Sequence, residues 1–315
     1  MIQNENRNPT LPGGTLRLAV VGLGKMGLMH LASLRRISGV EVSAVVDVDA
    51  GKSRLAALQG VPFFTSSHDI LGRVDAAIVA TPATEHTEST LPLLAGGIHC
   101  LVEKPLAMTL PDIEWLGGVA TRHAALLAVG QSERFNPGVA SAQAFIASKG
   151  VRHIHVLRKQ VTAGPIETEL DVVQDLMIHD LDWIVRALRQ LPENLSVTDA
   201  RWVDQRLESV TCTLAFPGAI QVVLEASRMG PSRQRNITLH DGHAAVVIPL
   251  DQRRGMQPDA LTRQAAAFLG LVREQATSIA TWQEALDVMV IVDRIRASCR
   301  PPVAVGEDTA LAVHV

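Results

Sequence analysis

The sequence predicts a two-domain α/β protein, with an N-terminal doubly wound parallel sheet and a C-terminal α/β domain built on a large, mostly antiparallel sheet. In the first 130 residues, short apolar runs alternate with helical patterns, as in parallel strands joined by crossover helices. Beyond them, several stretches of alternating polar and apolar residues follow one another closely, as in antiparallel sheets. A glycine-rich turn directly after the first apolar run also indicates a ligand site at the edge of the first sheet.

The elements of the first domain follow from this alternation. Apolar runs predict its parallel strands at residues 16–21, 42–46, 76–80, 99–102 and 125–129. Apolar residues at helical spacing predict the intervening helices at residues 26–37, 53–59, 87–95 and 111–120. We expect the polar residues 1–14 to be a disordered leader and residues 15–131 to form the first domain.

The second domain is expected over residues 132–315 and contains one long amphipathic helix at residues 172–188. Alternating stretches predict strands at residues 154–161, 196–203, 209–216, 220–226, 236–239 and 244–248. Further helices are predicted at residues 258–275 and 281–297. A substrate bound at the edge of the first sheet would therefore lie between the two domains.

The composition argues against several functional classes. The chain of 315 residues is 47% apolar and 19% charged with a net charge of −3, so we expect a globular protein that binds neither nucleic acid nor a membrane surface. No apolar run is long enough to span a bilayer, and no cluster of His, Cys and Asp has metal-ligand spacing, so no metal is predicted. Three widely separated cysteines, Cys100, Cys212 and Cys299, indicate reduced thiols in a cytoplasmic protein.

The turn after the first strand has the form Gly22-x-Gly24-x-x-Gly27, which is typical of a site for the pyrophosphate of a dinucleotide. The first glycine permits a tight turn, the second lets phosphates approach the backbone, and the third lets helix and strand pack closely. Lys25 and Met26 lie inside this turn and begin a helix whose N-terminus attracts an anion. All five residues are therefore candidates for binding the cofactor.

Three more segments follow strands at the same edge of the first sheet. Asp47 ends the second strand, 20 residues beyond Gly27, which is the spacing at which a carboxylate reaches the adenosine ribose. A carboxylate there would repel a 2′-phosphate, so the sequence favours NAD over NADP as cofactor. The other candidate cofactor residues follow the next strands of the sheet: Thr81, Pro82, His86, Glu103 and Lys104.

Lys104 is also a candidate catalytic residue. It lies directly after a buried strand and before Pro105, which restricts the backbone of the residue that precedes it. A lysine at this edge can donate a hydrogen bond to a reacting oxygen and stabilise the negative charge that develops on it. The tripeptide Glu-Lys-Pro is common in surface turns, so the interpretation depends on its position in the fold.

The helix at residues 172–188 carries Asp175, His179, Asp182 and Arg186 on one polar stripe. Ordinary ion pairs on a solvated face would explain this stripe. Alternatively, Asp175 and His179 form a pair in which the carboxylate stabilises the protonated imidazole, and the imidazole takes the hydroxyl proton when an alcohol is oxidised. A lysine can also serve as such a base, so Lys104 is kept as the other candidate.

Four motifs occur in an order and at a spacing that resemble the Gfo/Idh/MocA family of sugar and polyol dehydrogenases. They are GLGKMG (22–27), ATPATEH (80–86), EKP (103–105) and DLMIHDLD (175–182). The resemblance covers about residues 16–188 and implies a Rossmann domain, hydride transfer between a sugar carbon and NAD, and a homodimer or homotetramer formed through the second domain. It also implies catalytic roles for Lys104, Asp175 and His179, and substrate contacts from Arg134 and Asn136 in the loop GQSERFNP.

The stretch that begins at Arg158 resembles the branch of this family that oxidises UDP-N-acetylglucosamine at C3 for lipid A or surface-glycan synthesis. Arg158, Gly164-Pro165 and Asp171-Val172-Val173 carry this resemblance, which implies a nucleotide-sugar substrate held partly by Arg158 and a keto product that is either released or passed to a PLP-dependent aminotransferase. An inositol or free-sugar dehydrogenase and a non-catalytic NAD-binding regulator are the alternatives. Candidates for binding the diphosphate are Arg158, Arg233, Arg235, Arg253 and Arg254.

Overall fold

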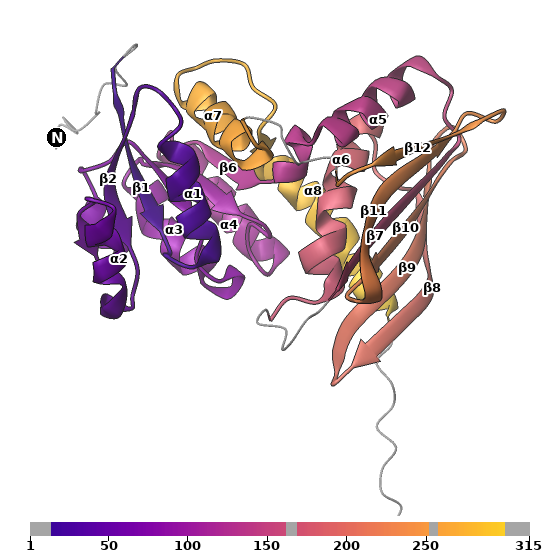
Figure 1. Cartoon of the computed structure of the whole chain (residues 1–315), viewed down its shortest axis with the longest axis horizontal. Coiled ribbons are helices and arrows are strands. Elements are labelled where there is room, and N and C mark those ends of the chain that lie inside the picture. Colours follow the sequence, from indigo (N-terminus) through magenta and orange to yellow (C-terminus); the bar gives the residue numbers. More distant parts are fainter. Residues whose placement is uncertain (1–13, 162–168, 252–257, 300–315) are drawn as a thin grey trace, which may run out of the picture.

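The computed structural model describes residues 14–161, 169–251 and 258–299, which form two β-sheets with helices between and around them (Figure 1). Most of the predicted leader, the Gly164-Pro165 pair and the Arg253-Arg254 pair lie outside the described residues. The two-domain α/β architecture predicted from the sequence is confirmed.

Within the described residues, the first sheet has seven strands in the order β13-β6-β5-β4-β1-β2-β3. Apart from β13, neighbouring strands are parallel: β1 (Leu16–Val21), β2 (Val40–Val46), β3 (Phe63–Phe64), β4 (Ala76–Val79), β5 (His99–Glu103) and β6 (Leu127–Gly130). The α-helices between these strands are α1 (Lys25–Leu34), α2 (Ser53–Leu58), α3 (His86–Ala95) and α4 (Leu110–Arg122).

Both faces of this sheet are buried, which explains why its strands are continuous apolar runs rather than alternating ones. Ala19 and Val21 of β1 belong to the core that α3 and α4 cover, whereas Leu18 and Val20 belong to the core beside α1. All four side chains are almost completely excluded from solvent. Successive residues of a strand point to opposite faces, so one short strand contributes to two cores.

The second sheet has six strands in the order β12-β11-β7-β10-β9-β8 in the part of the chain that the structure describes. The strands are β7 (His153–Val161), β8 (Asn194–Val203), β9 (Arg206–Phe216), β10 (Ile220–Ser227), β11 (Met229–His240) and β12 (Ala245–Pro249). Only the pairing of β7 with β10 is parallel, so the sheet is mostly antiparallel, as predicted.

The helices α5 (Pro137–Ser148), α6 (Ile178–Leu188) and α8 (Trp282–Ser298) lie between this sheet and the first domain (Figure 1). The helix predicted at residues 172–188 begins with a π-helical turn at Val173–Met177 and continues as α6. The Oδ1 atom of Asp171 starts this turn by accepting hydrogen bonds from the N–H groups of Val173 and Gln174, at 2.9 and 3.0 Å. Helix α5 was not predicted, because its small residues give only a weak amphipathic pattern.

The structure differs from the predicted domain ranges at one place. Helix α7 (Ala260–Val272) packs against α1 and contributes Phe268 and Leu269 to the core beside α1. Strand β13 (Ala280–Thr281) then pairs antiparallel with β6 at the edge of the first sheet. Part of the range 132–315 therefore completes the first domain. The apolar face of a helix can be read from sequence, but the sheet that it covers cannot.

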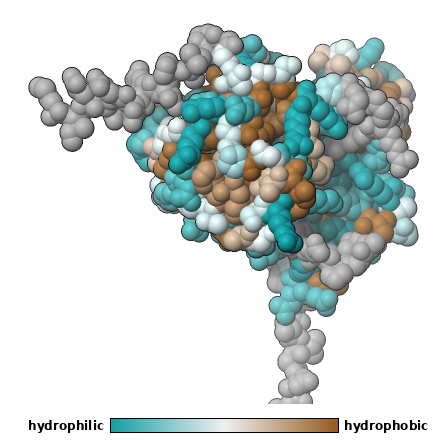
Figure 2. All heavy atoms as spheres, turned by 60° about the vertical axis from the view of Figure 1, so that its left-hand side comes forward, coloured by the Kyte–Doolittle hydropathy of each residue, from teal (hydrophilic) through white to brown (hydrophobic). Residues whose placement is uncertain are grey.

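The outer side of the first domain has the mixed surface of a globular protein. Figure 2 shows apolar side chains gathered there among hydrophilic ones. Among the described residues, we find no helix with both the length and the apolar character that crossing a bilayer requires.

Replacing Gly27 by Ala should destabilise the first domain. A Cβ at this position would lie 1.8 Å from the carbonyl oxygen of Gly22, so α1 and β1 would have to separate. Overpacking of this kind costs about 1–3 kcal/mol and occasionally more, and the free energy of unfolding in urea should fall by that amount or more. Gly24→Ala is the matched control, because a Cβ there has no heavy atom within 4 Å. Equal destabilisation by both substitutions would contradict this explanation.

Candidate active site

A cleft of about 900 Å³ lies between the carboxyl edge of the first sheet and the elements α6, β7 and β11 of the second domain. Its lining comes from segments that are far apart in the sequence, including α1, the end of β5, the turn before α6, and the start of α7. The predicted site residues that line it are Lys25, Met26, Thr81, His86, Glu103, Lys104, Asn136, Arg158, Asp175 and His179.

The glycine turn fits the pyrophosphate of a dinucleotide. Gly22 has a φ of +94°, and a Cβ there would lie 2.7 Å from the carbonyl carbon of Ala80, so this close approach of two loops requires glycine. A Cβ on Gly24 would meet no heavy atom within 4 Å, which leaves open space above the backbone. Helix α1 starts at Lys25, and its first turn offers backbone N–H groups and the positive end of the helix dipole to an anion.

Asp47 lies at the end of β2, against the glycine turn. Its Oδ2 accepts hydrogen bonds from Leu23 N–H at 2.7 Å and from Lys52 Nζ at 2.9 Å, and its Oδ1 accepts one from Asp49 N–H at 3.0 Å. Burial alone would raise the pKa of Asp47, but these hydrogen bonds and the charge of Lys52 hold it below its usual value. The carboxylate is therefore ionised at neutral pH and suited to accept hydrogen bonds from ribose hydroxyls.

His86 lies between the two loops that follow β4 and β5. Its Nδ1 lies 2.8 Å from the carbonyl oxygen of Pro105, and its Nε2 lies 3.1 Å from that of Thr81. Pro82 precedes the short turn that leads into His86. Because the ring is only 1% exposed, its main contribution is to hold the loop that carries Lys104. Burial lowers the pKa of His86, which favours the neutral ring.

Glu103 connects β5 to α1 inside the protein. Its Oε1 lies 2.7 Å from Nε2 of His30, a residue that is completely buried. Burial would raise the pKa of Glu103, but the hydrogen bond and charge of His30 and the charge of Lys104 hold it below its usual value. A buried carboxylate at this position keeps the helix that begins at the glycine turn in register with the strand that ends at Lys104.

Lys104 and Asp175 form the central contact of the cleft. The Nζ atom of Lys104 donates to Asp175 Oδ1 at 2.9 Å and to the Asp175 carbonyl oxygen at 2.8 Å. Arg228 Nη1 contacts the other carboxylate oxygen of Asp175 at 3.3 Å. Among the described residues, Asp175 thus contacts two cations, and no hydrogen bond joins it to His179 as the sequence had predicted.

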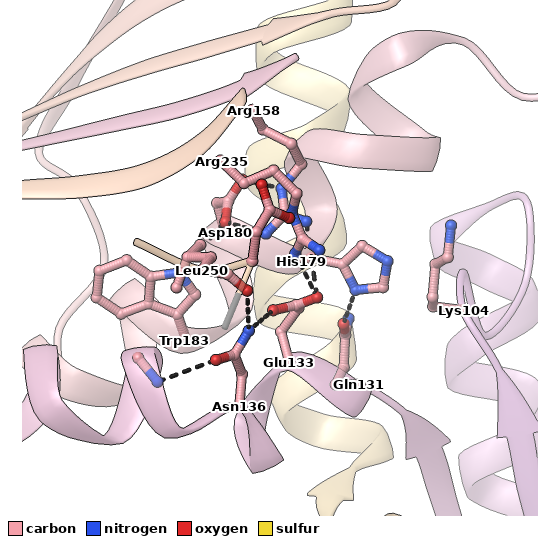
Figure 3. Close-up of polar contacts among 12 residues, drawn as sticks. Lys104, Gln131, Glu133, Asn136, Arg158, His179, Asp180, Trp183, Arg235 and Leu250 are labelled. Atoms are coloured by element: carbon pink, nitrogen blue, oxygen red, sulfur yellow. Dashed lines mark hydrogen bonds and ion pairs between the residues drawn. The ribbon is translucent and has the colours of Figure 1, made fainter. Parts of the chain in front are cut away.

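His179 is oriented by a neutral side chain instead. Its Nδ1 lies 3.2 Å from Oε1 of Gln131, and the imidazole ring lies between Gln131 and Lys104 (Figure 3). Burial lowers the pKa of His179 well below its usual value, and the positive charges of Lys104 and Arg158 lower it further. The ring is therefore neutral at physiological pH and can accept a proton.

Behind His179, buried arginines are matched by buried carboxylates (Figure 3). Arg158 makes two bonds of 2.6 Å to Asp180, and both side chains are 3% exposed. Arg235 contacts Glu133 at 2.5 Å, and the amide of Asn136 donates to Glu133 at 2.9 Å. Arg158 and Asn136 thus line the cleft as parts of a hydrogen-bonded wall, with their polar groups already engaged.

Arg134 does not line this cleft, so its prediction as a substrate residue is corrected. It makes two bonds of 2.7 Å to Asp182 and one of 3.0 Å to Glu284. These residues and Arg186 line a separate cavity of about 570 Å³. Asp182 and Arg186 share a helical stripe with His179 but lie about one and two turns further along α6, outside the cleft.

Gln131 and Glu133 were missed by the sequence analysis. Both lie in the turn directly after β6, at the carboxyl edge of the first sheet, which is the signal that could have identified them. Among the described residues, no group of three or more His, Cys, Asp or Glu side chains could hold a metal ion.

Replacing Asp180 by Ala should strongly destabilise the protein. Of the carboxylates that pair with Arg158 among the described residues, the substitution leaves Glu133, at 3.7 Å from the buried guanidinium. Breaking a buried ion pair from one side costs about 3–5 kcal/mol, which urea unfolding would measure. Asp199→Ala, which removes the exposed pair with Arg201 (66% and 46% exposed), is the control and should cost no more than about 1 kcal/mol. A loss of about 1 kcal/mol or less in Asp180→Ala would contradict the role of Asp180 as the partner that neutralises Arg158.

Replacing Asp47 by Ala should weaken NAD binding and improve binding of NADP. The loss of hydrogen bonds to a charged group costs about 1.5–3 kcal/mol, so the Kd for NAD should rise about 10–100-fold. Lys52, released from its 2.9 Å contact with Asp47, would be able to meet a 2′-phosphate. Titration of protein fluorescence with each cofactor measures both constants. Glu41→Ala, at the exposed start of the same strand, should leave them unchanged.

Comparison with known proteins connects this geometry to one family. Residues 16–131 match the Gfo/Idh/MocA family, described as an oxidoreductase family with an NAD-binding Rossmann fold. The chain is 27% identical over 234 residues to a UDP-N-acetylglucosamine 3-dehydrogenase of Acidithiobacillus ferrooxidans, covering 73% of this chain and 74% of that protein. It is 33% identical over 184 residues to an inositol 2-dehydrogenase of Pseudarthrobacter chlorophenolicus, a match that spans 54% of this chain and about half (53%) of the relative.

Solved structures show the same fold. The A. ferrooxidans UDP-N-acetylglucosamine 3-dehydrogenase has a TM-score of 0.82 at 22% identity, over 90% of this chain and 97% of that one. A scyllo-inositol dehydrogenase of Lactobacillus casei, with bound NAD(H) and scyllo-inositol, has a TM-score of 0.79 at 16% identity, over 90% and 97% of the two chains. With the glycine turn and Asp47, these findings show that residues 16–131 form an NAD-binding Rossmann domain of the Gfo/Idh/MocA oxidoreductase type, and that the whole chain shares its fold with dehydrogenases.

Proposed function

We propose that this oxidoreductase oxidises the C3 hydroxyl of UDP-N-acetylglucosamine to a ketone. The observation that carries the proposal is that Lys104, Asp175 and His179 meet in one cleft with the glycine turn. This cleft can receive a dinucleotide on one side and an alcohol on the other. A relative that covers most of this chain is a dehydrogenase of that nucleotide sugar, which supports the choice of substrate.

Lys104 positions the reacting hydroxyl. The ammonium group of Lys104 has three N–H donors, and two of them donate to the carbonyl oxygen and the carboxylate of Asp175. The remaining donor is directed to the substrate oxygen and stabilises the negative charge that grows on it as the C–H bond breaks. The contact of Asp175 with Arg228 limits the movement of the carboxylate and therefore of the ammonium group.

His179 takes the hydroxyl proton. Its neutral ring can accept that proton, whereas Lys104 is already an ammonium donor to Asp175, so we assign the base to His179 rather than to Lys104. The NAD held at the glycine turn supplies the acceptor for the hydride that leaves C3. Glu103 and His86 hold the loop of Lys104 in place during this reaction.

The diphosphate of the substrate meets arginines at the mouth of the cleft. Arg158 and Arg235 are neutralised inside the protein by Asp180 and Glu133. Arg233 lines the cleft with a 57% exposed side chain whose pair with Asp251, at 3.3 Å, is also exposed, and Arg36 and Arg263 line the cleft as well. Arginine binds phosphate bidentately, so these three side chains are the proposed contacts.

An inositol dehydrogenase is the second candidate function. The inositol 2-dehydrogenase described above is 33% identical to this chain, a higher identity than that of the UDP-N-acetylglucosamine 3-dehydrogenase, although the aligned segment is shorter. The same three catalytic side chains would serve a free polyol. A non-catalytic NAD-binding regulator has no chemical need for these three groups in one cleft, which argues against that alternative.

The proposed cellular setting follows from the chemistry. Oxidation of an alcohol by NAD at neutral pH is generally unfavourable, so we propose that a PLP-dependent aminotransferase consumes the ketone in the cytoplasm. We further propose a homodimer or homotetramer formed through the sheet of the second domain.

The test of this function is NADH formation from NAD and UDP-N-acetylglucosamine, with an aminotransferase and glutamate present to remove the ketone. Lys104→Met and His179→Gln should each lower kcat by about 10²–10⁴-fold, because each removes a group that acts in proton transfer or charge stabilisation. The exposed Lys149→Met and His123→Gln are the matched controls and should retain wild-type rates. Oxidation of myo-inositol instead of the nucleotide sugar would replace the proposed substrate, and turnover unaffected by either active-site change would refute the mechanism.

A further inference from the structure

Gln131 is held rigidly beside the proposed base. It directly follows β6 and is 2% exposed. Its backbone N–H donates to the carbonyl oxygen of Val129 at 2.8 Å, and its own carbonyl oxygen accepts from Arg134 N–H at 3.1 Å. The backbone on both sides of the residue is therefore fixed, and the side chain starts from a defined position.

The contact with His179 determines which ring nitrogen carries the proton. The amide oxygen Oε1 of Gln131 can only accept a hydrogen bond, and it lies 3.2 Å from Nδ1 of His179. In a neutral imidazole, Nδ1 must then be the protonated nitrogen and Nε2 must hold the free lone pair. Figure 3 shows Nδ1 turned toward Gln131 and the other ring nitrogen on the side of Lys104.

Because the ring of His179 is neutral, its tautomer decides whether it can accept a proton from the substrate. Burial is the main cause that lowers the pKa of His179. The positive charges of Lys104, Arg158 and Arg235 also lower it and the negative charge of Glu133 raises it, so that the ring stays neutral. A neutral imidazole exists in two tautomers, and only one of them presents an acceptor to the cleft. The opposite tautomer would point an N–H group at the substrate and could not take its proton.

A carboxylate in place of Gln131 would act differently. It would also accept from Nδ1–H, but its charge would favour the imidazolium form, which has no lone pair to accept a proton. The carboxylate that the sequence predicted for this role, Asp175, is engaged by Lys104 and Arg228. An amide thus orients the ring without charging it.

We propose that Gln131 is a positioning residue that holds His179 in the Nδ1–H tautomer and directs the Nε2 lone pair to the substrate hydroxyl. The mechanistic part of this inference rests on the proposed role of His179 as the base. The tautomer itself is a property of the protein without substrate.

The direct test is ¹⁵N NMR of the full chain labelled at histidine, recorded between mildly acidic and mildly alkaline pH. The signals that His179→Gln removes identify His179, and the shifts of its two nitrogens give the tautomer. We expect Nδ1–H in the wild-type protein and a shift toward Nε2–H in Gln131→Met, which keeps the length of the side chain without the acceptor. Wild-type protein in the Nε2–H form, or an unchanged tautomer in Gln131→Met, would overturn the proposal.

The pH dependence of kcat separates this role from a merely structural one. With whichever of UDP-N-acetylglucosamine or myo-inositol is turned over, Gln131→Met should lower kcat about 10–100-fold with KM nearly unchanged. Gln131→Glu should move the acid limb of the profile to higher pH by about 1–3 units and recover activity in alkaline solution. Gln221→Met, at an exposed position of β10, is the control. An unshifted profile in Gln131→Glu would contradict the proposal, whereas a wild-type protein inactive on both substrates would refute the proposed function and leave the NMR result standing.

Discussion

The ion pair between Lys104 and Asp175 is the contact on which the rest of the site depends. It connects residues that are 71 positions apart in the chain and joins the end of β5 to the π-helical turn that precedes α6. The first sheet carries the cofactor site and α6 carries His179, so this pair sets the position of one relative to the other. The pair also occupies the carboxylate of Asp175, which could otherwise have stabilised the protonated imidazole of His179. The neutral amide of Gln131 then orients the ring.

The same rule, that a buried charge needs a partner, shapes the wall of the cleft. Arg158 with Asp180 and Arg235 with Glu133 are pairs in which each side chain is 3–4% exposed. Isolated, any of these groups would cost several kcal/mol to bury, on the order of the whole stability of a domain. Pairing makes the interior of the cleft nearly neutral, and Arg233, at its mouth, remains half exposed. Such a distribution suits a substrate with a neutral reacting part and an anionic part further out.

Relatives of this fold act on different substrates, as the names of the nucleotide-sugar and inositol dehydrogenases indicate. The fold alone therefore does not select the substrate, and the choice must come from side chains in the cleft. The return of α7 and β13 to the first domain matters here. It places the start of α7 beside α1 in the lining of the cleft, to which β11 of the second domain also contributes Arg233.

The sequence alone determined the local features of this protein. Apolar runs located the strands of the first sheet, since a strand buried on both faces excludes polar residues. The glycine spacing and Asp47 predicted where the cofactor binds, because that turn requires those residue types within one short segment. What only the tertiary structure decided was the pairing of charges. Asp175 binds Lys104 rather than His179, and Arg134 lies outside the cleft. Helical spacing predicts which residues share a stripe, but the partner of a charged group depends on chain segments that meet only when the domains pack.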